Sequence, residues 1–188
     1  MKKYPVIIYI CLILIIRFLS MHQGETKKSY PTQFRNIFRD PTAILMGIFA
    51  IIAFAAPITE AVIKEYSGYV TFQCIGGIMM LCGGIVAYNA NREISENWSP
   101  VIDKSEDQQL VTAGVYQYVR HPLYFTGLLI HSGSNIYFNN TWAWITTLLV
   151  LIAILYRIPR EEKALINKFG DAYLEYKKNS RALIPGIF

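Results

Sequence analysis

The sequence has few charged residues for its length, and long stretches contain none. Asp, Glu, Lys and Arg make up 16% of the 188 residues, whereas a soluble domain usually carries about a quarter. Apolar residues reach 53% and are gathered into runs. A helix that crosses a membrane needs about 20 mostly apolar residues. The composition therefore argues against a soluble domain and predicts an all-α, polytopic integral-membrane helical bundle.

Several motifs of soluble enzymes are also missing. The sequence has no P-loop, no G-x-G-x-x-G and no nucleophile elbow, and no alternation of strand and helix patterns that a Rossmann-type methyltransferase or dehydrogenase requires. The histidines lack metal-ligand spacing: His22, His121 and His131. The cysteines fall inside apolar runs, where they suit packing: Cys11, Cys74 and Cys82. No metal site is expected.

The apolar runs predict about five membrane helices, at 4–19, 42–63, 69–90, 123–138 and 141–158. The second run is interrupted by Pro57. The first could instead be a signal peptide, but no small-residue cleavage site follows it, so we expect a retained helix. In the third, Gly76-Gly77 and Gly83-Gly84 stand seven residues apart on one face, which predicts a close helix crossing.

Lysine and arginine are unevenly distributed between the two sides that these spans create. If the loops 20–40 and 91–122 and the tail share one side, that side, together with Arg17, holds 15 of the 18 basic residues. The other side holds Lys2, Lys3 and Lys64. Since cytoplasmic loops carry the excess of basic residues, we expect these loops and the tail in the cytoplasm and the N-terminus outside. The net charge of +5 is then a topology signal, and no nucleic-acid partner is expected.

One polar cluster, Arg120-His121-Pro122-Leu123-Tyr124, stands at the mouth of the fourth apolar run. Pro122 disfavours helical geometry at the residue before it, so His121 is predicted at a helix entrance with unpaired backbone N–H groups nearby. Such groups can bind a carboxylate or hydroxyls. The plainer interpretation is an interfacial Arg, His and Tyr beside a helix-starting proline, and the cluster alone does not decide between the two.

A second polar cluster, Arg157, Arg160, Glu161 and Glu162, follows the fifth run. Its plain interpretation is a surface pair between Arg157 and Glu161 at i,i+4. However, a charge at the end of a lipid span is costly and is usually functional. A hairpin that turns at 139–140 would return both clusters to the same cytoplasmic face, which favours a shared site.

The segment around these clusters predicts further local structure. The connection 91–119 is long and polar, which is often a functional sign, and Gly114 indicates a turn before Arg120. Pro159 should end or kink the fifth helix. A new amphipathic helix is then predicted over 161–178, lying on the cytoplasmic membrane surface.

Taken as a set, these residues resemble the isoprenylcysteine carboxyl methyltransferase family of integral-membrane S-adenosylmethionine enzymes. The similarity covers about residues 91–188 and includes five pieces: Asn97-Trp98-Ser99, Leu110-Val111 with Gly114-Val115-Tyr116, 120–124, Arg157 with Glu161-Glu162, and 169–176. The resemblance implies an N-terminal three-helix membrane region at 1–90 and a catalytic region at 91–188, forming one structural unit in which the cytoplasmic loop and C-terminal helix wrap the cofactor.

The resemblance also implies roles for individual residues. The S-adenosylmethionine site would be lined by Gln108, Gln109, Leu110, Val111, Tyr116, Arg120, His121, Pro122, Leu123, Tyr124, Glu161 and Glu162. Family members often carry histidine where this chain has Gln108. Arg157 would bind and orient the acceptor carboxylate and is the expected catalytic residue.

The expected function is S-adenosylmethionine-dependent methyl transfer to a membrane-soluble acceptor, with a prenylcysteine-type carboxylate as the leading acceptor and membrane lipid around it. One alternative is a lipid amine or small thiol acceptor in the same fold. An amine would need a base to remove its proton. An alternative of another class is a non-catalytic membrane scaffold or carrier, which would leave both polar clusters unexplained.

Overall fold

The fold is known from a computed structural model that describes residues 10–11, 15, 41–63, 69–94 and 109–187. The elements are α3 (Pro41–Ile63), α4 (Val70–Ile94), the 3-10 helix η2 (Gly114–Gln117), α5 (Pro122–Tyr137), α6 (Ala143–Phe169) and α7 (Asp171–Asn179). Over these residues the structure contains helices and one isolated β-bridge, so the predicted α-helical class is confirmed there. The first predicted span, 4–19, lies largely outside the described residues.

Four of the predicted spans correspond to helices. The runs 42–63, 69–90, 123–138 and 141–158 appear as α3, α4, α5 and α6, with ends that differ by a few residues and, for α6, by eleven. Pro57 lies inside α3 without ending it. The turn between α5 and α6 contains Asn139 at φ 51°, as expected for the 139–140 turn, because asparagine tolerates left-handed backbone better than most residues.

The predicted helix break at Pro159 is wrong. Helix α6 continues through Pro159 to Phe169, and the chain breaks at Gly170, which has φ 56°. The predicted 161–178 helix is therefore divided between the end of α6 and the separate α7. A proline inside a helix costs about 3 kcal/mol, but the ion pair from Arg157 to Glu161 joins the turns on either side of it. Burial of Ile158 and Glu162 adds packing on both sides.

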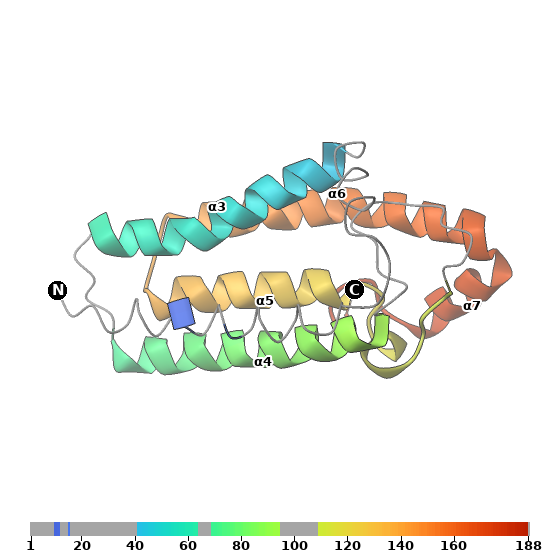
Figure 1. The fold of residues 1–188 in the computed structure, drawn as a ribbon, viewed down its shortest axis with the longest axis horizontal. Coiled ribbons are helices and arrows are strands. Elements are labelled where there is room, and N and C mark those ends of the chain that lie inside the picture. Colours follow the sequence, from blue (N-terminus) through green and yellow to red (C-terminus); the bar gives the residue numbers. More distant parts are fainter. Residues whose placement is uncertain (1–9, 12–14, 16–40, 64–68, 95–108, 188) are drawn as a thin grey trace.

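The helices pack as two pairs. Helix α4 lies against α5 and α3 lies against α6, with α5 also contacting α6 (Figure 1). The α4–α5 crossing is close because glycines face each other: a Cβ added at Gly76 would lie 2.3 Å from the Gly133 carbonyl oxygen, and one at Gly83 would lie 2.8 Å from Ile130. The predicted close crossing is confirmed, although Gly77 faces open space.

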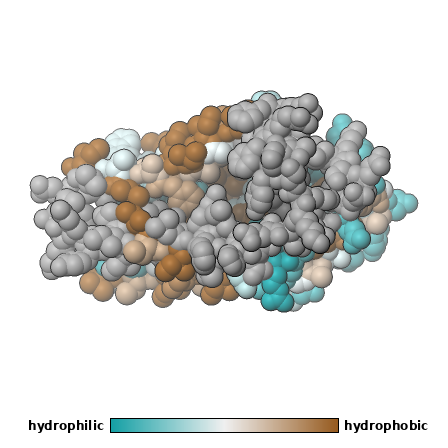
Figure 2. All heavy atoms as spheres, in the orientation of Figure 1, coloured by the Kyte–Doolittle hydropathy of each residue, from teal (hydrophilic) through white to brown (hydrophobic). Residues whose placement is uncertain are grey.

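The outer faces of the long helices are apolar. Large hydrophobic side chains are exposed on α3, α4 and α6: Ile51, Ile78, Ile85, Leu148 and Ile152. Among the described helices, α4 and α6 are long and apolar enough to cross a membrane. Figure 2 shows hydrophobic residues along the helices and hydrophilic ones towards the end that carries η2 and α7. An exposed apolar surface of this extent is unusual in a soluble monomer and suits contact with lipid.

Helix α6 is longer than a membrane is thick. Its 27 residues correspond to about 40 Å of helix, against about 30 Å for the hydrocarbon layer. Its apolar part ends at Ile158, and we take 143–158 as the membrane-spanning part. The charged remainder, 159–169, projects beyond it, towards α7 and η2.

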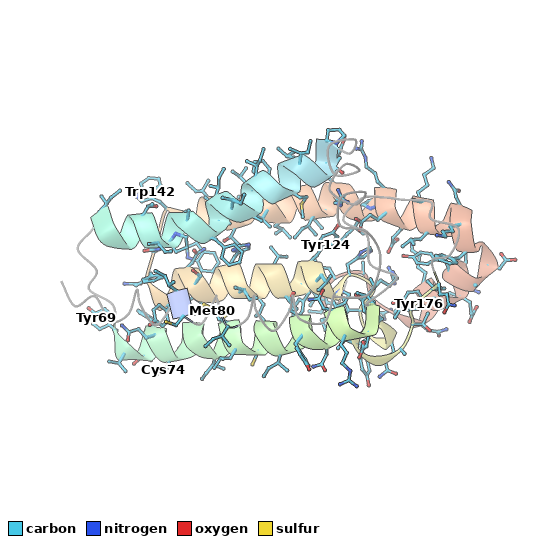
Figure 3. All side chains as sticks on the ribbon, viewed as in Figure 1. Tyr69, Cys74, Met80, Tyr124, Trp142 and Tyr176 are labelled. Atoms are coloured by element: carbon cyan, nitrogen blue, oxygen red, sulfur yellow. The ribbon has the colours of Figure 1, made fainter. Side chains whose placement is uncertain are left out.

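The opposite end of α6 is fastened to α3. The Glu60 carboxylate accepts hydrogen bonds from the backbone N–H groups of Thr141, Trp142 and Ala143, at 2.9 to 3.3 Å. Asn140 donates through Nδ2 to the Pro57 carbonyl at 2.8 Å. The first N–H groups of a helix have no partner within the helix, and a carboxylate there is favoured by the helix dipole. Figure 3 shows Trp142 beside the end of α3.

Candidate functional site

The loop that leads into α5 is held by the C-terminal tail. Val119 and Arg181 form an isolated parallel bridge. The amides of Arg120 and His121 donate to the carbonyls of Arg181 and Ala182, at 2.8 and 3.0 Å, and Arg181 donates back to Tyr118 at 3.0 Å. His121 is the N-cap of α5, as predicted, and Pro122 follows at the first helical position, where its missing N–H costs nothing. The expected unpaired amides are not at Arg120 or His121.

Arg157 occupies a polar cluster with residues from three helices. It is 3% exposed. Its Nε donates to the Tyr124 hydroxyl at 2.8 Å and to Glu161 Oε1 at 2.7 Å, and its Nη1 donates to Thr42 Oγ1 at 2.7 Å. Tyr124 in turn donates to Glu161 Oε1 at 2.6 Å. The expected i,i+4 pair is present, but it is nearly enclosed rather than on an open surface. Figure 3 shows Tyr124 between α5 and α6.

Glu162 is the centre of a second cluster beside the first. Its Oε1 is 2.7 Å from Arg120 Nε, and its Oε2 is 2.6 Å from Lys177 Nζ. Arg120 also donates through Nη1 to the carbonyls of Ser180 and of Lys177. The cluster thus ties the entrance of α5 to α6, α7 and the tail. Charge-assisted hydrogen bonds of this kind are about twice as strong as neutral ones.

His121 lies between the two adjacent glutamates. Its Nδ1 is 3.4 Å from Glu161 Oε2, and its Nε2 is 3.7 Å from Glu162 Oε1, which is too long for a direct hydrogen bond. Its ring stacks on that of Tyr124, with centroids 5.6 Å apart and planes at 15°. His121 therefore joins the two clusters.

Burial and charge oppose each other in this region. Burial alone would lower the pKa of His121, but the nearby carboxylates of Glu161 and Glu162 raise it above its usual value. Burial alone would raise the pKa of Glu162, but His121, Lys177 and Arg120 lower it to about 2. At neutral pH Glu162 is therefore ionised, and His121 is biased towards its charged form.

A small cavity lies on the other side of Arg120. It has a volume of about 80 Å³, which is room for several waters or one flat ring. Its lining combines apolar, aromatic and polar groups: Ile94, Gln109, Leu110, Val111, Tyr116, Arg120, Leu165, Phe169, Tyr173 and Tyr176. A concave, mostly apolar site with a few polar groups is the usual form of a small-molecule site.

Local structure around the cavity follows from Gly114 and Tyr116. Gly114 has φ 58° at the start of η2, and a Cβ there would collide with the Glu93 carboxylate. Glu93 accepts a hydrogen bond from the Val115 amide at 2.8 Å. Tyr116 is buried, and its carbonyl accepts a hydrogen bond from the Tyr176 hydroxyl at 2.6 Å. The turn expected at Gly114 is confirmed.

The predicted site residues fall into two neighbouring groups. Gln109, Leu110, Val111 and Tyr116 line the cavity, and Arg120 lines it while pairing with Glu162. The polar clusters contain His121, Tyr124, Arg157, Glu161 and Glu162. Pro122 and Leu123 form the first turn of α5 between them. Gln108 lies outside the described residues.

Sequence reasoning missed several residues of this region. Thr42 contacts Arg157 from 115 positions away, a separation with no signal in the sequence. Lys177 and Ser180 contact Glu162 and Arg120. The resemblance implied that the C-terminal helix wraps the cofactor, but it did not name the residues of α6 and α7 that line the cavity: Leu165, Phe169, Tyr173 and Tyr176. Their helical periodicity indicated only an amphipathic helix on the membrane surface.

Comparison with known proteins places the chain in a family. Residues 72–172 match the model of the family described as phospholipid methyltransferase. Relatives include the protein-S-isoprenylcysteine O-methyltransferases of Dictyostelium discoideum, 32% identical over 60% of this chain and 49% of the relative, and of Xenopus laevis, 34% identical over 60% and 40%. The probable protein-S-isoprenylcysteine O-methyltransferase of Oryza sativa subsp. indica is 31% identical over 69% of this chain and 70% of the relative.

A solved structure shares the fold. The eukaryotic intramembrane Ras methyltransferase ICMT superposes with a TM-score of 0.56 at 24% sequence identity, over 75% of this chain and 52% of that one. The chain spans half or less of the length of the first relatives, 49% and 40%. The family model nevertheless covers more than half of the 188 residues, in agreement with the resemblance found in the sequence. The chain therefore belongs to the phospholipid methyltransferase family and has protein-S-isoprenylcysteine O-methyltransferases among its relatives.

Proposed function

We propose that the chain is an S-adenosylmethionine-dependent methyltransferase that methylates the carboxylate of a prenylcysteine-type, membrane-soluble acceptor. The observation that carries the proposal is the position of Arg157. A guanidinium that is 3% exposed, at the end of an apolar helix and beside the paired glutamates, is costly unless it serves a purpose there. The names of the relatives support the same acceptor.

The residues present suit the proposed cofactor. S-adenosylmethionine carries a flat nucleobase, a ribose, an ammonium group, a carboxylate and a sulfonium. The aromatic cavity provides flat apolar walls. Tyr173 lines it, and the buried hydroxyl of Tyr173 has no hydrogen-bond partner among the described residues. Glu161 and Glu162 provide negative charge, and each carboxylate can accept further hydrogen bonds beyond those it makes. Gln109, Leu110, Val111, Tyr116 and the 120–124 segment would hold the cofactor.

When bound, S-adenosylmethionine would supply a methyl group on a sulfonium sulfur, so that a carboxylate oxygen gives the electron pair for the new O–C bond and the C–S pair returns to sulfur. The acceptor carboxylate is ionised at neutral pH and needs no base. Arg157 would hold and orient it, with Tyr124, Glu161 and Thr42 fixing the guanidinium. Good orientation alone can contribute several kcal/mol.

A phospholipid amine is the second candidate acceptor, because the matching family model is described as phospholipid methyltransferase. An ammonium group would first have to lose its proton, for which His121 or a glutamate is the nearest base. The clusters pair three cations, Arg120, Arg157 and Lys177, with the two carboxylates of Glu161 and Glu162, and the excess of positive charge disfavours an ammonium group. The charges therefore favour the carboxylate.

Two measurements test the proposal. Calorimetry on the purified, detergent-solubilised protein with S-adenosylhomocysteine should show binding, and absence of binding at high micromolar concentration would refute a methyltransferase. Transfer of labelled methyl from the cofactor should then favour farnesylcysteine analogues over ethanolamine phospholipids. Preferential labelling of the phospholipid would identify the lipid amine, rather than a carboxylate, as the acceptor.

We also propose the wider architecture. Five membrane helices, counting the segment 4–19, form one unit in which the region 1–90 supports the catalytic region 91–188, with the site and the C-terminal helix facing the cytoplasm. The contact between Thr42 and Arg157, and the packing of α3 on α6 and α4 on α5, support a single unit. The distribution of basic residues supports the orientation.

A further inference from the structure

One part of the cavity lining is built by the end of α6 and by α7. It contains Leu165 and Phe169 from α6, and Tyr173 and Tyr176 from α7. The rings of Tyr173 and Tyr176 meet edge to face, with centroids 5.8 Å apart and planes at 76°. Figure 3 labels Tyr176 at the end of the molecule where α7 lies. This part of the lining is therefore largely aromatic, and the rest includes 109–111 and Tyr116.

The two tyrosines of α7 differ in what their hydroxyl groups bind. The Tyr176 hydroxyl donates to the Tyr116 carbonyl at 2.6 Å. Tyr173 is only 1% exposed, and within the part of the chain that the structure describes its hydroxyl has no hydrogen-bond partner. A buried hydroxyl without a partner destabilises a protein by about 1–3 kcal/mol. Phenylalanine would fill the same space without that cost, so the hydroxyl suits a partner that is not part of the chain.

The cavity fits a flat ring with polar edges. Its aromatic walls offer surfaces on which a ring can stack, and its volume of about 80 Å³ admits one ring rather than a whole cofactor. Arg120 lines the cavity and pairs with Glu162, so the remainder of a ligand could extend from here to the polar clusters. An aromatic nucleobase has ring nitrogens and an exocyclic amine that a hydroxyl can meet.

We propose that Tyr173 is a ligand-binding residue whose hydroxyl hydrogen-bonds the edge of the cofactor's nucleobase, with the aromatic wall of α6 and α7 holding the ring. This inference rests on the proposed function and names the part of the site that recognises the base. The resemblance already implies that the C-terminal helix wraps the cofactor; the new element is a specific contact between one hydroxyl of α7 and the base.

The test substitutes Tyr173→Phe in the full chain and measures S-adenosylhomocysteine binding by calorimetry. Loss of one neutral hydrogen bond predicts about three- to tenfold weaker binding. Without ligand, the thermal midpoint should stay the same or rise, since an unpaired buried hydroxyl is removed. Tyr176→Phe is the matched control: it removes a hydroxyl that has a partner in the chain, so its midpoint should fall.

An analogue tests the contact with the base itself. S-inosylhomocysteine, which carries a carbonyl in place of the exocyclic amine, should bind the parent less tightly, and Tyr173→Phe should reduce that discrimination. Equal affinity of parent and Tyr173→Phe for S-adenosylhomocysteine would overturn the inference and leave the proposed function standing. A fall in the ligand-free midpoint of Tyr173→Phe would also overturn it, because the hydroxyl would then have a structural partner. Failure of the parent to bind S-adenosylhomocysteine would overturn both.

Discussion

Arg157 is fastened by hydrogen bonds to Thr42, Tyr124 and Glu161, so its guanidinium is held ready before any acceptor arrives. We predict that Arg157→Ala lowers methylation of a carboxylate acceptor by about 10²–10³-fold, the usual effect of losing one fixed charge-stabilising group. S-adenosylhomocysteine affinity should change by less than about threefold, because Arg157 does not line the cavity. Turnover of labelled cofactor and calorimetry measure the two effects.

Arg160 provides a matched control for that substitution. It lies three residues further along α6. The sequence groups it with Arg157, Glu161 and Glu162, but in the structure it is exposed and stacks over the exposed Tyr156 ring at 3.9 Å. Arg160→Ala should therefore leave turnover near the parent value. Equal loss in both variants, or intact turnover in Arg157→Ala, would contradict the role given to Arg157.

His121 should make stability depend on pH. Its pKa in the folded protein is raised, so its contribution is complete below the unfolded value of about 6.5 and is lost as the pH rises through the folded value. Glu162, with its pKa lowered to about 2, contributes above about pH 4.5 and loses its contribution as the pH falls towards 2. The unfolding midpoint in detergent should therefore be highest at about pH 5–6.5.

The variant His121→Gln isolates the alkaline part of this profile. Glutamine keeps hydrogen-bonding capacity but does not titrate, so the decline above pH 6.5 should become shallower. The acid decline should be reduced but should persist, because Lys177 and Arg120 still lower the pKa of Glu162. Thermal unfolding of parent and variant across pH 4–9 measures the difference. Parallel profiles at alkaline pH would show that the His121 charge does not stabilise the fold.

Among the helices, the α4–α5 pair depends on the absence of side chains at its crossing. A Cβ at Gly76 would meet backbone atoms of Gly133 and Tyr137 at 2.3 and 2.6 Å, whereas one at Gly77 would meet nothing. Gly76→Ala should lower the free energy of unfolding by about 1–3 kcal/mol, as overpacking does. Gly77→Ala should be neutral or stabilise by up to about 1 kcal/mol, because alanine favours helix. Denaturant unfolding in micelles compares the free energies of unfolding of the two variants. Similar changes in both would contradict a close helix crossing at Gly76.

The α3–α6 pair depends on Glu60 at the outer end of the bundle. Glu60→Ala should destabilise by about 1–2 kcal/mol, as loss of a helix N-cap does, because three backbone amides lose their acceptor. Thr59→Ala is the control, since the exposed Thr59 hydroxyl donates to the carbonyls of Ala55 and Ala56 in its own helix. Unfolding midpoints of the two variants measure the effect. An unchanged midpoint for Glu60→Ala would show that α6 does not need this acceptor.

Helix positions followed from the sequence where a single local signal decides them. The apolar runs placed α3 to α6, and Gly114 and Asn139 marked turns. Pro159 was misjudged because the local cost of proline is outweighed by burial of Ile158 and Glu162 and by the Arg157–Glu161 pair across it. Thr42 and the Tyr173 hydroxyl, which has no partner in the described part of the chain, have no local signal at all, since only the folded arrangement places them at the site.

For the whole molecule, the charge distribution predicts which end faces the cytoplasm. Lys178 lies exposed on α7, and Thr141 lies exposed at the turn between α5 and α6. After replacement of Cys11, Cys74 and Cys82, single cysteines at Lys178 and at Thr141 can be labelled with an impermeant maleimide. Intact cells should label Thr141→Cys alone, and permeabilised cells should label both. Labelling of Lys178→Cys in intact cells would invert the proposed orientation.

The pairing of the 118–121 loop with the tail has an evolutionary consequence. Its three hydrogen bonds join backbone groups, so they do not depend on which side chain stands at the exposed Arg181. The number of residues between α7 and the bridge is constrained instead. One inserted or deleted residue there would shift the carbonyls of Arg181 and Ala182 away from the amides of Arg120 and His121. Close relatives are thus expected to exchange residues freely at position 181 while keeping an unchanged number of residues between α7 and the bridge.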